Sequence, residues 1–271
     1  MRALMLGDIV GRPGREALKS RLREIRRRFG IDLVIANGEN AAGGIGLTAP
    51  VLKELFAAGV DVVTSGNHIW RHADIYPVLE SEERIIRPAN MPAGAPGRGH
   101  TRIRLENGPE ILVVNLIGRT FMEALDCPFA AAEAILAETP DAVRLRFVDF
   151  HAEASSEKRA MGFFLDGRVS ALAGTHTHVQ TADAHIFPGG MAYITDLGMC
   201  GNERASILGM DQKAVLARFT TGLPARFTPA PGTGAINGLL LDLDTATGKA
   251  DSVSLFRDSA PRFTDPSRHS E

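Results

Sequence analysis

The chain has 271 residues, with 30 Lys and Arg against 32 Asp and Glu, and a formal net charge of −2. This balance provides no extended basic surface for nucleic acid, and the length suffices for a substantial hydrophobic core. Its two cysteines, Cys127 and Cys200, lie far apart in sequence, which excludes a disulfide framework and a thiolate zinc site.

Hydropathy and the N-terminal residues indicate where the protein acts. No apolar run approaches transmembrane length, and the chain opens on a strand-like run without a signal-peptide pattern. We therefore expect a cytoplasmic protein without a membrane partner. We expect one domain over residues 1–257 and a loose polar tail over 258–271. Whether the protein forms a homo-oligomer is left open.

The first third of the chain alternates short apolar runs with helical patterns. Strands and helices are predicted in turn at residues 3–6, 13–29, 32–36, 49–58 and 60–63. Gly30 and Gly59 stand where the two helices would end. The alternation predicts βαβ units and a parallel sheet buried on both faces. In such sheets, ligands bind beyond the carboxyl ends of the strands.

The rest of the chain continues in short elements. Asn107 and Gly108 predict a hairpin turn between strands at 101–105 and 111–116. Helices are then predicted at 128–138, 155–165 and 211–219, and strands at 146–150, 169–173, 185–187, 191–195, 236–243 and 251–256.

Polar side chains of ligand type follow five of the predicted strands. They are Asp8, then Glu39 with Asn40, then Asn67 with His68, then His151, and finally His176 with His178. One such residue is usually a cap or a satisfied loop group, but five strand ends together indicate a metal site. Carboxylate, amide and imidazole ligands suit borderline divalent metals, and Glu39 is a candidate to bridge two ions. The spacing of the last two histidines places both imidazoles on one side if the extended conformation persists.

The order of these clusters resembles that of the metallophosphoesterase superfamily. The matching motifs are Gly7-Asp8, Gly38-Glu39-Asn40, Gly66-Asn67-His68, His151 and Gly174-Thr-His-Thr-His178. The variants GDIVGRPG, NGENAAGG and SGNH are similar to the YmdB-like family of that superfamily. The resemblance implies a four-layered α/β sandwich, with two mixed β-sheets flanked by helices. It also implies a phosphodiesterase that hydrolyses 2',3'- or 3',5'-cyclic nucleotides through attack of a metal-bridging hydroxide on phosphorus.

The resemblance further implies a role for each residue. Two divalent or trivalent ions per chain are expected, with iron implied by the family and manganese or zinc left open. Asp8 and His178 would hold one ion, Asn67, His151 and His176 the other, and Glu39 would bridge them with Asn40 nearby. His68 would face the phosphate and protonate the leaving group.

Three positions depart from the usual superfamily pattern. Val10 stands where the first motif usually has histidine, and Glu39 replaces the usual bridging aspartate. Ile69 follows His68, so no carboxylate next in sequence orients that imidazole. Asn40 is therefore a candidate to fill the coordination left by the missing histidine, or to orient the nucleophile.

Other interpretations use the same residues. A regulatory protein that binds a nucleotide at the metal site as a sensor, with little turnover, would keep the same ligands. A metal-dependent amidohydrolase is a weaker alternative, because the Gly-Asn-His motif speaks against it. Trp70 has two interpretations, stacking on a base or packing beside the metal loop.

Overall fold

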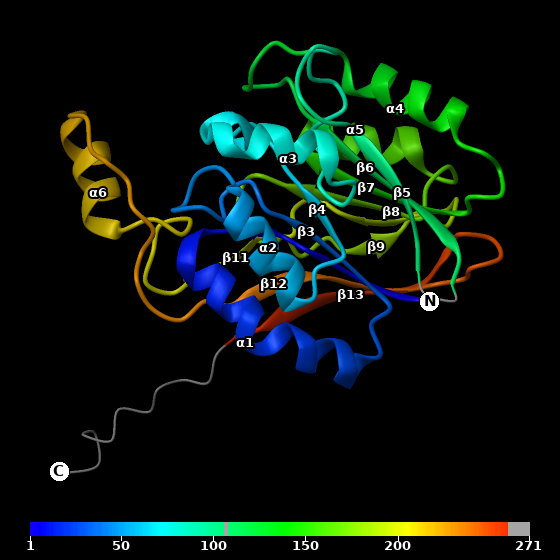
Figure 1. Ribbon diagram of the computed structural model, residues 1–271, viewed down its shortest axis with the longest axis horizontal. Helices are drawn as coiled ribbons and strands as arrows, with labels where there is room; N and C mark the ends of the chain where they lie inside the picture. The colour runs from blue at the N-terminus through cyan, green and yellow to red at the C-terminus, as the bar shows by residue number, and fades with distance from the viewer. Residues whose placement is uncertain (106–107, 260–271) are drawn as a thin grey trace.

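The computed structural model describes residues 1–105 and 108–259 of the chain (Figure 1). The strands are β1 Arg2–Leu6, β2 Asp8–Ile9, β3 Leu33–Asn37, β4 Val62–Thr64, β5 His100–Arg104, β6 Glu110–Ile117, β7 Leu145–His151, β8 Ala171–Thr175, β9 His185–Ile186, β10 Ala192–Ile194, β11 Met199–Cys200, β12 Ile236–Leu243 and β13 Ala250–Asp258. The α-helices are α1 Gly11–Phe29, α2 Ala49–Ala58, α3 Tyr76–Ser81, α4 Pro128–Glu138, α5 Ser155–Leu165 and α6 Gln212–Thr221, and two 3-10 turns, η1 Ile69–Arg71 and η2 Ala73–Ile75, precede α3.

The first large sheet has the strand order β13-β12-β1-β3-β4. β1, β3 and β4 run parallel, as the βαβ pattern predicts, and Met5 of β1 pairs with Ile35 of β3. β12 lies antiparallel on the other side of β1, where Leu239 pairs with Met5. A strand from near the C-terminus therefore completes the N-terminal sheet.

The second sheet has the strand order β5-β6-β7-β8-β10-β9. Its central strands β6, β7, β8 and β10 are parallel, and both edge strands, β5 and β9, are antiparallel. The expected antiparallel pairing of β5 with β6 is confirmed, but residues 106–107 of its turn lie outside the described residues.

The two sheets pack face to face between helices, and the alternation of side chains along each strand explains the layers. In β1, Leu4 and Leu6 pack toward α1 and α2, whereas Ala3 and Met5 pack between the sheets. In the second sheet, Phe147 belongs to this central layer. The other face of that sheet packs against α4 and α5. The four-layered sandwich expected from the sequence is confirmed (Figure 1).

Several local expectations can be compared with the structure. Gly30 ends α1 in the left-handed conformation, with φ of 62°, as expected for a glycine at this position. Asp258, where the loose tail was expected to begin, pairs with Ile236 in the terminal hairpin, and residues 260–271 of the expected tail lie outside the described residues. Within the described part of the chain, no helix is both long and apolar enough to cross a membrane.

Candidate metal centre

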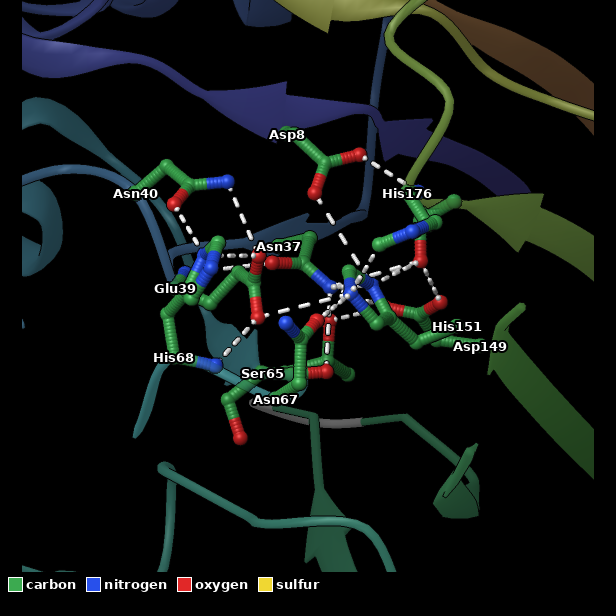
Figure 2. Close-up of polar contacts among 12 residues, drawn as sticks. Asp8, Asn37, Glu39, Asn40, Ser65, Asn67, His68, Asp149, His151 and His176 are labelled. Atoms are coloured by element: carbon green, nitrogen blue, oxygen red, sulfur yellow. Dashed lines mark hydrogen bonds and ion pairs between the residues drawn. The ribbon is translucent and has the colours of Figure 1, made fainter. Parts of the chain in front are cut away.

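The carboxyl ends of the parallel strands in both sheets meet at one edge of the sandwich, and all eight predicted site residues lie there. Figure 2 labels these residues except His178. The first sheet supplies residues at or after β1, β3 and β4, namely Asp8, Glu39, Asn40, Asn67 and His68. The second sheet supplies residues at or after β7 and β8, namely His151, His176 and His178. The site therefore spans the junction of the two sheets.

Three buried side chains form the centre of the cluster. Asp8, Glu39 and His151 each offer one ligand atom, and these atoms all lie within 4.8 Å of one another. Oδ2 of Asp8 accepts the backbone N–H of His176 at 3.0 Å, whereas Oδ1 is buried and, among the described residues, has no hydrogen-bond partner. Burial, followed by the charge of Glu39, raises the pKa of Asp8 well above its usual value. A cation at this point would satisfy the orphaned oxygen and offset both carboxylate charges.

Nε2 of His151 faces the middle of the cluster. It lies 3.4 Å from Oε2 of Glu39, 2.9 Å from Oδ1 of Asn67 and 3.0 Å from Nδ1 of His176. Burial lowers the pKa of His151 to about 3, so the imidazole is neutral near pH 7. Several lone-pair atoms thus crowd one small volume, which is the arrangement a metal ion requires.

The opposite nitrogen of His151 has a partner outside the cluster. Its Nδ1 lies 3.0 Å from Oγ1 of Thr175, and that hydroxyl donates to Oδ1 of Asp149 at 2.7 Å. Because the threonine proton is used on the carboxylate, the hydroxyl accepts the Nδ1–H of His151. This fixes the tautomer that leaves the Nε2 lone pair for a metal.

The other two histidines are oriented in the same way. Nε2 of His176 lies 3.0 Å from Oε2 of Glu153, which leaves its Nδ1 toward His151. Nδ1 of His178 lies 3.0 Å from the carbonyl oxygen of Leu208, and its Nε2 lies 3.8 Å from Oδ1 of Asp8. Each imidazole therefore has one nitrogen held by an oxygen and the other turned toward the cluster.

The histidine loop differs from the sequence expectation in one respect. β8 ends at Thr175, so the extended conformation does not persist to His178. His176 and His178 adopt positive φ values of 100° and 66°, which non-glycine residues rarely do. A strained loop, and not the alternation of a strand, brings the imidazole of His178 toward Asp8 and that of His176 to His151.

A buried ion pair anchors this loop. Nζ of Lys158 in α5 donates to Oδ2 of Asp196 at 2.7 Å, and both side chains are buried. The same carboxylate oxygen accepts the backbone N–H of Thr177, between the two histidines, at 3.1 Å. Asp196 therefore holds the histidine loop in place.

His68 and Asn40 form a pair beside the carboxylate of Glu39. Nδ1 of His68 lies 2.8 Å from Oδ1 of Asn40 and 3.0 Å from Oε1 of Glu39. Burial alone would lower the pKa of His68, but the hydrogen bond and charge of Glu39 outweigh burial and raise it. Asn40 also donates to Oε1 of Glu39 at 2.8 Å and lies 3.3 Å from Nε2 of His178. These contacts orient the neighbouring His68 side chain, a role outside the two expected ones, and coordination or nucleophile orientation by Asn40 stays a prediction.

A polar network beneath the centre was missed at the sequence level. Asp149 is buried within β7 and accepts hydrogen bonds from Thr64, Thr175 and, at 3.0 Å, the side chain of Asn37. Burial raises the pKa of Asp149 to about 6, although these three hydrogen bonds oppose the change. The sequence does contain a sign of this network, because Asp149 is a lone carboxylate within a predicted apolar strand.

A cavity of about 420 Å³ opens onto the cluster. Glu39, Asn40, His68, His176 and His178 line one part of it, and apolar side chains, including Phe219 and Phe227, line the rest. Trp70 packs elsewhere, edge-on against Tyr76 with ring centroids 5.7 Å apart, which supports its packing interpretation.

The donor set fits a metal centre. It combines carboxylate and amide oxygens with neutral imidazole nitrogens, and both free cysteines lie outside it. Borderline metals such as iron, manganese and zinc accept such mixed ligands. The orphaned oxygen of Asp8 and the crowded lone pairs around His151 are the observations that support this fit.

The fold and the donor set define a metallophosphoesterase, and comparison with known proteins gives the family. The model of the YmdB-like protein family matches residues 4–256, and the chain belongs to the YmdB-like family. The 2',3'-cyclic-nucleotide 2'-phosphodiesterase of Bacillus subtilis is 47% identical over 253 residues, which cover 93% of this chain and 95% of that protein.

Solved structures agree with this assignment. The crystal structure of a hypothetical protein from Thermus thermophilus matches with a TM-score of 0.90 and 44% identity, over 96% of this chain and 100% of that one. A novel phosphatase from Mycoplasma pneumoniae matches with a TM-score of 0.90 and 32% identity, over 95% and 93% of the two chains.

Proposed function

We propose that the protein is a metal-dependent phosphodiesterase that hydrolyses 2',3'- or 3',5'-cyclic nucleotides. The observation that carries the proposal is the convergence of Asp8, Glu39 and His151 next to an open cavity. The relative from Bacillus subtilis, whose name states this activity, supports the substrate class.

The ligand assignment is part of the proposal. Asp8 and His178 would hold one ion, Asn67, His151 and His176 would hold a second, and Glu39 would be shared between them with Asn40 beside it. When bound, the ions lower the pKa of water at the site and offset charge on the phosphate oxygens. The family favours iron, and manganese and zinc suit the same ligands.

His68 is the proposed general acid. Its Nδ1 is held by Asn40 and Glu39, which leaves Nε2 for the leaving oxygen in the cavity. Water adds to phosphorus as the bond from phosphorus to that oxygen breaks, and the proton from His68 turns the leaving oxygen into a hydroxyl, so the cyclic phosphodiester opens to a monoester. Asn40 positions His68 and does not itself exchange a proton.

Turnover by metal-loaded protein tests the function. The purified protein is loaded in turn with Fe, Mn and Zn, and is assayed on 2',3'- and 3',5'-cyclic nucleotides with product analysis. Linear monoester products are expected, and Asp8→Asn should abolish their formation. Tight nucleotide binding without turnover by every metal form would contradict the enzyme and favour the regulatory sensor.

Metal analysis tests the ligand assignment separately. Two ions per chain are expected, as in other two-metal sites. Loss of His178 should remove one ion and leave the other, because the two ions have different terminal ligands. A wild-type protein that saturates at one ion per chain would rule out the bridging role of Glu39.

A further inference from the structure

The cavity at the metal centre has two unlike parts. The polar part carries the candidate metal ligands and His68. The apolar part, which we call the apolar wall, consists of Ile45, Ile207, Leu208, Met210, Val215, Phe219 and Phe227. No described side chain of the apolar wall carries a charge or a hydrogen-bonding group other than the thioether of Met210.

The aromatic residues of this wall are exposed to an unusual degree. α6 stands out from the body of the molecule at the left of Figure 1, and 80% of Phe219 is accessible to solvent. Phe227, which follows α6, is 46% exposed. Large apolar groups gathered on a soluble surface generally mark a place where a ligand or partner binds.

We propose that Phe219 and Phe227 form the seat of the nucleobase, on which the base of the substrate stacks. This inference rests on the proposed function, because a phosphate held at the histidines leaves the rest of the nucleotide on the apolar side of the same cavity. A base has two apolar faces and a polar edge, so it can cover the rings and still present its edge to water.

The composition of the wall also predicts the selectivity of the seat. Without charged or amide side chains in the wall, the base is held by stacking and not by hydrogen bonds to its edge. Stacking is tolerant of base identity, because every base has an aromatic face. The enzyme should therefore accept all four bases, with a modest preference for purines because of their larger face.

The seat is connected to the metal ligands through one loop. Leu208 belongs to the wall, and its carbonyl oxygen accepts the Nδ1–H of His178 at 3.0 Å. Ile207 and Met210 bond to each other through both backbone groups, at 2.9 and 3.0 Å, which makes the turn between them rigid. The exposed rings of Phe219 and Phe227 are therefore the positions to change, because they are not part of this support.

The test compares a substrate with a base and one without. Phe219→Ala and Phe227→Ala are assayed on a cyclic nucleotide and on glycerol 1,2-cyclic phosphate, which has the cyclic ester but no base. We expect kcat/KM for the nucleotide to fall about 5- to 100-fold, mostly through KM, since stacking is worth this much per base. Rates on the glycerol ester should be unchanged. Phe219→Trp should keep kcat/KM for the nucleotide near that of the wild-type protein, because tryptophan also offers an aromatic face. Leu216→Ala is the matched control, because Leu216 lies on the same helix, is 52% exposed and does not belong to the wall.

Other outcomes would contradict the proposal that Phe219 and Phe227 bind the nucleobase. Equal losses on both substrates, or no loss on the nucleotide, exclude base stacking by these rings. If sedimentation shows that Phe219→Ala separates copies of the chain, and activity falls on both substrates, then α6 is an interface between copies. If wild-type protein turns over neither substrate, the proposed function fails. Equilibrium dialysis with cyclic AMP then still tests the seat, because Phe219→Ala must weaken binding.

Discussion

The Nε2 atom of His176 lies 3.0 Å from Oε2 of Glu153, so the carboxylate holds the imidazole with Nδ1 toward the metal site. The side chain of Glu153 is 49% exposed, and it therefore orients the histidine without supporting the core. Glu153→Ala should weaken metal binding about 10- to 100-fold, the usual effect of losing a partner of a metal ligand. The measurement is a metal titration together with thermal unfolding of the metal-free protein.

Glu133→Ala is the control for that substitution. Glu133 is also an exposed carboxylate in an ion pair, with Arg168, but it lies on α4 and away from the site. Unchanged metal affinity in Glu153→Ala, or an equal loss in Glu133→Ala, would show that the carboxylate has no role in ligand orientation.

Glu39→Gln should abolish turnover and leave the fold intact. An amide cannot neutralise the charge of two ions, and the apolar strands behind Glu39 are unaffected. We expect a loss of at least about 100-fold, since even partners outside the coordination sphere cost 10- to 100-fold. Glu54→Gln, at an exposed ion pair with Arg15, is the control. Near-normal turnover by folded Glu39→Gln at saturating metal would contradict the bridging assignment.

His68→Ala should keep both metals and lose turnover. General acid catalysis is typically worth about 10²- to 10⁴-fold, so a loss of that order is expected for a cyclic nucleotide. An activated aryl phosphodiester has a better leaving group and should lose less. Metal content is measured on the same samples. Equal losses on both substrates with weaker metal binding would mean that His68 only supports the position of Asn67.

Gly66→Ala should lose metal binding through steric overlap. A Cβ at Gly66 would collide with Nε2 of His151 and Oε2 of Glu39, so both ligands would have to move. Gly94→Ala is the matched control, because a Cβ there meets nothing within 4 Å. Full metal content in Gly66→Ala would show that the two ligands can shift without cost.

The sequence predicts the site well where ligands follow strands. Asp8, Glu39 and Asn67 lie together because the ends of the parallel strands β1, β3 and β4 share one edge. His151 joins them from the second sheet, and this depends on how the two sheets pack. The helices from Ala49 to Ala58 and from Pro128 to Glu138 match the predicted ranges, since apolar periodicity and flanking Gly or Pro define their ends.

Features that depend on tertiary packing could not be predicted from the sequence patterns. Nothing in the spacing of His176 and His178 indicates positive φ values, because these come from a loop held by Lys158 and Asp196. The apolar wall was also missed. Phe219 lies on a helix whose pattern resembles an ordinary core-facing one, and only the structure shows that helix standing away from the core.

The position of β12 has a consequence for the newly made protein. β1, which leads directly into Asp8, lies between β3 and β12, and the backbone N–H of Gly7 donates to Asn237 of β12 at 3.1 Å. Translation has added all eight candidate site residues once it reaches His178. The strand β12, which pairs with β1 and so positions Asp8, follows only at residues 236–243. A growing chain on the ribosome therefore carries every ligand for some time without a working site. Activity should begin only after β12 has been translated, and products that stop before β12 should be inactive.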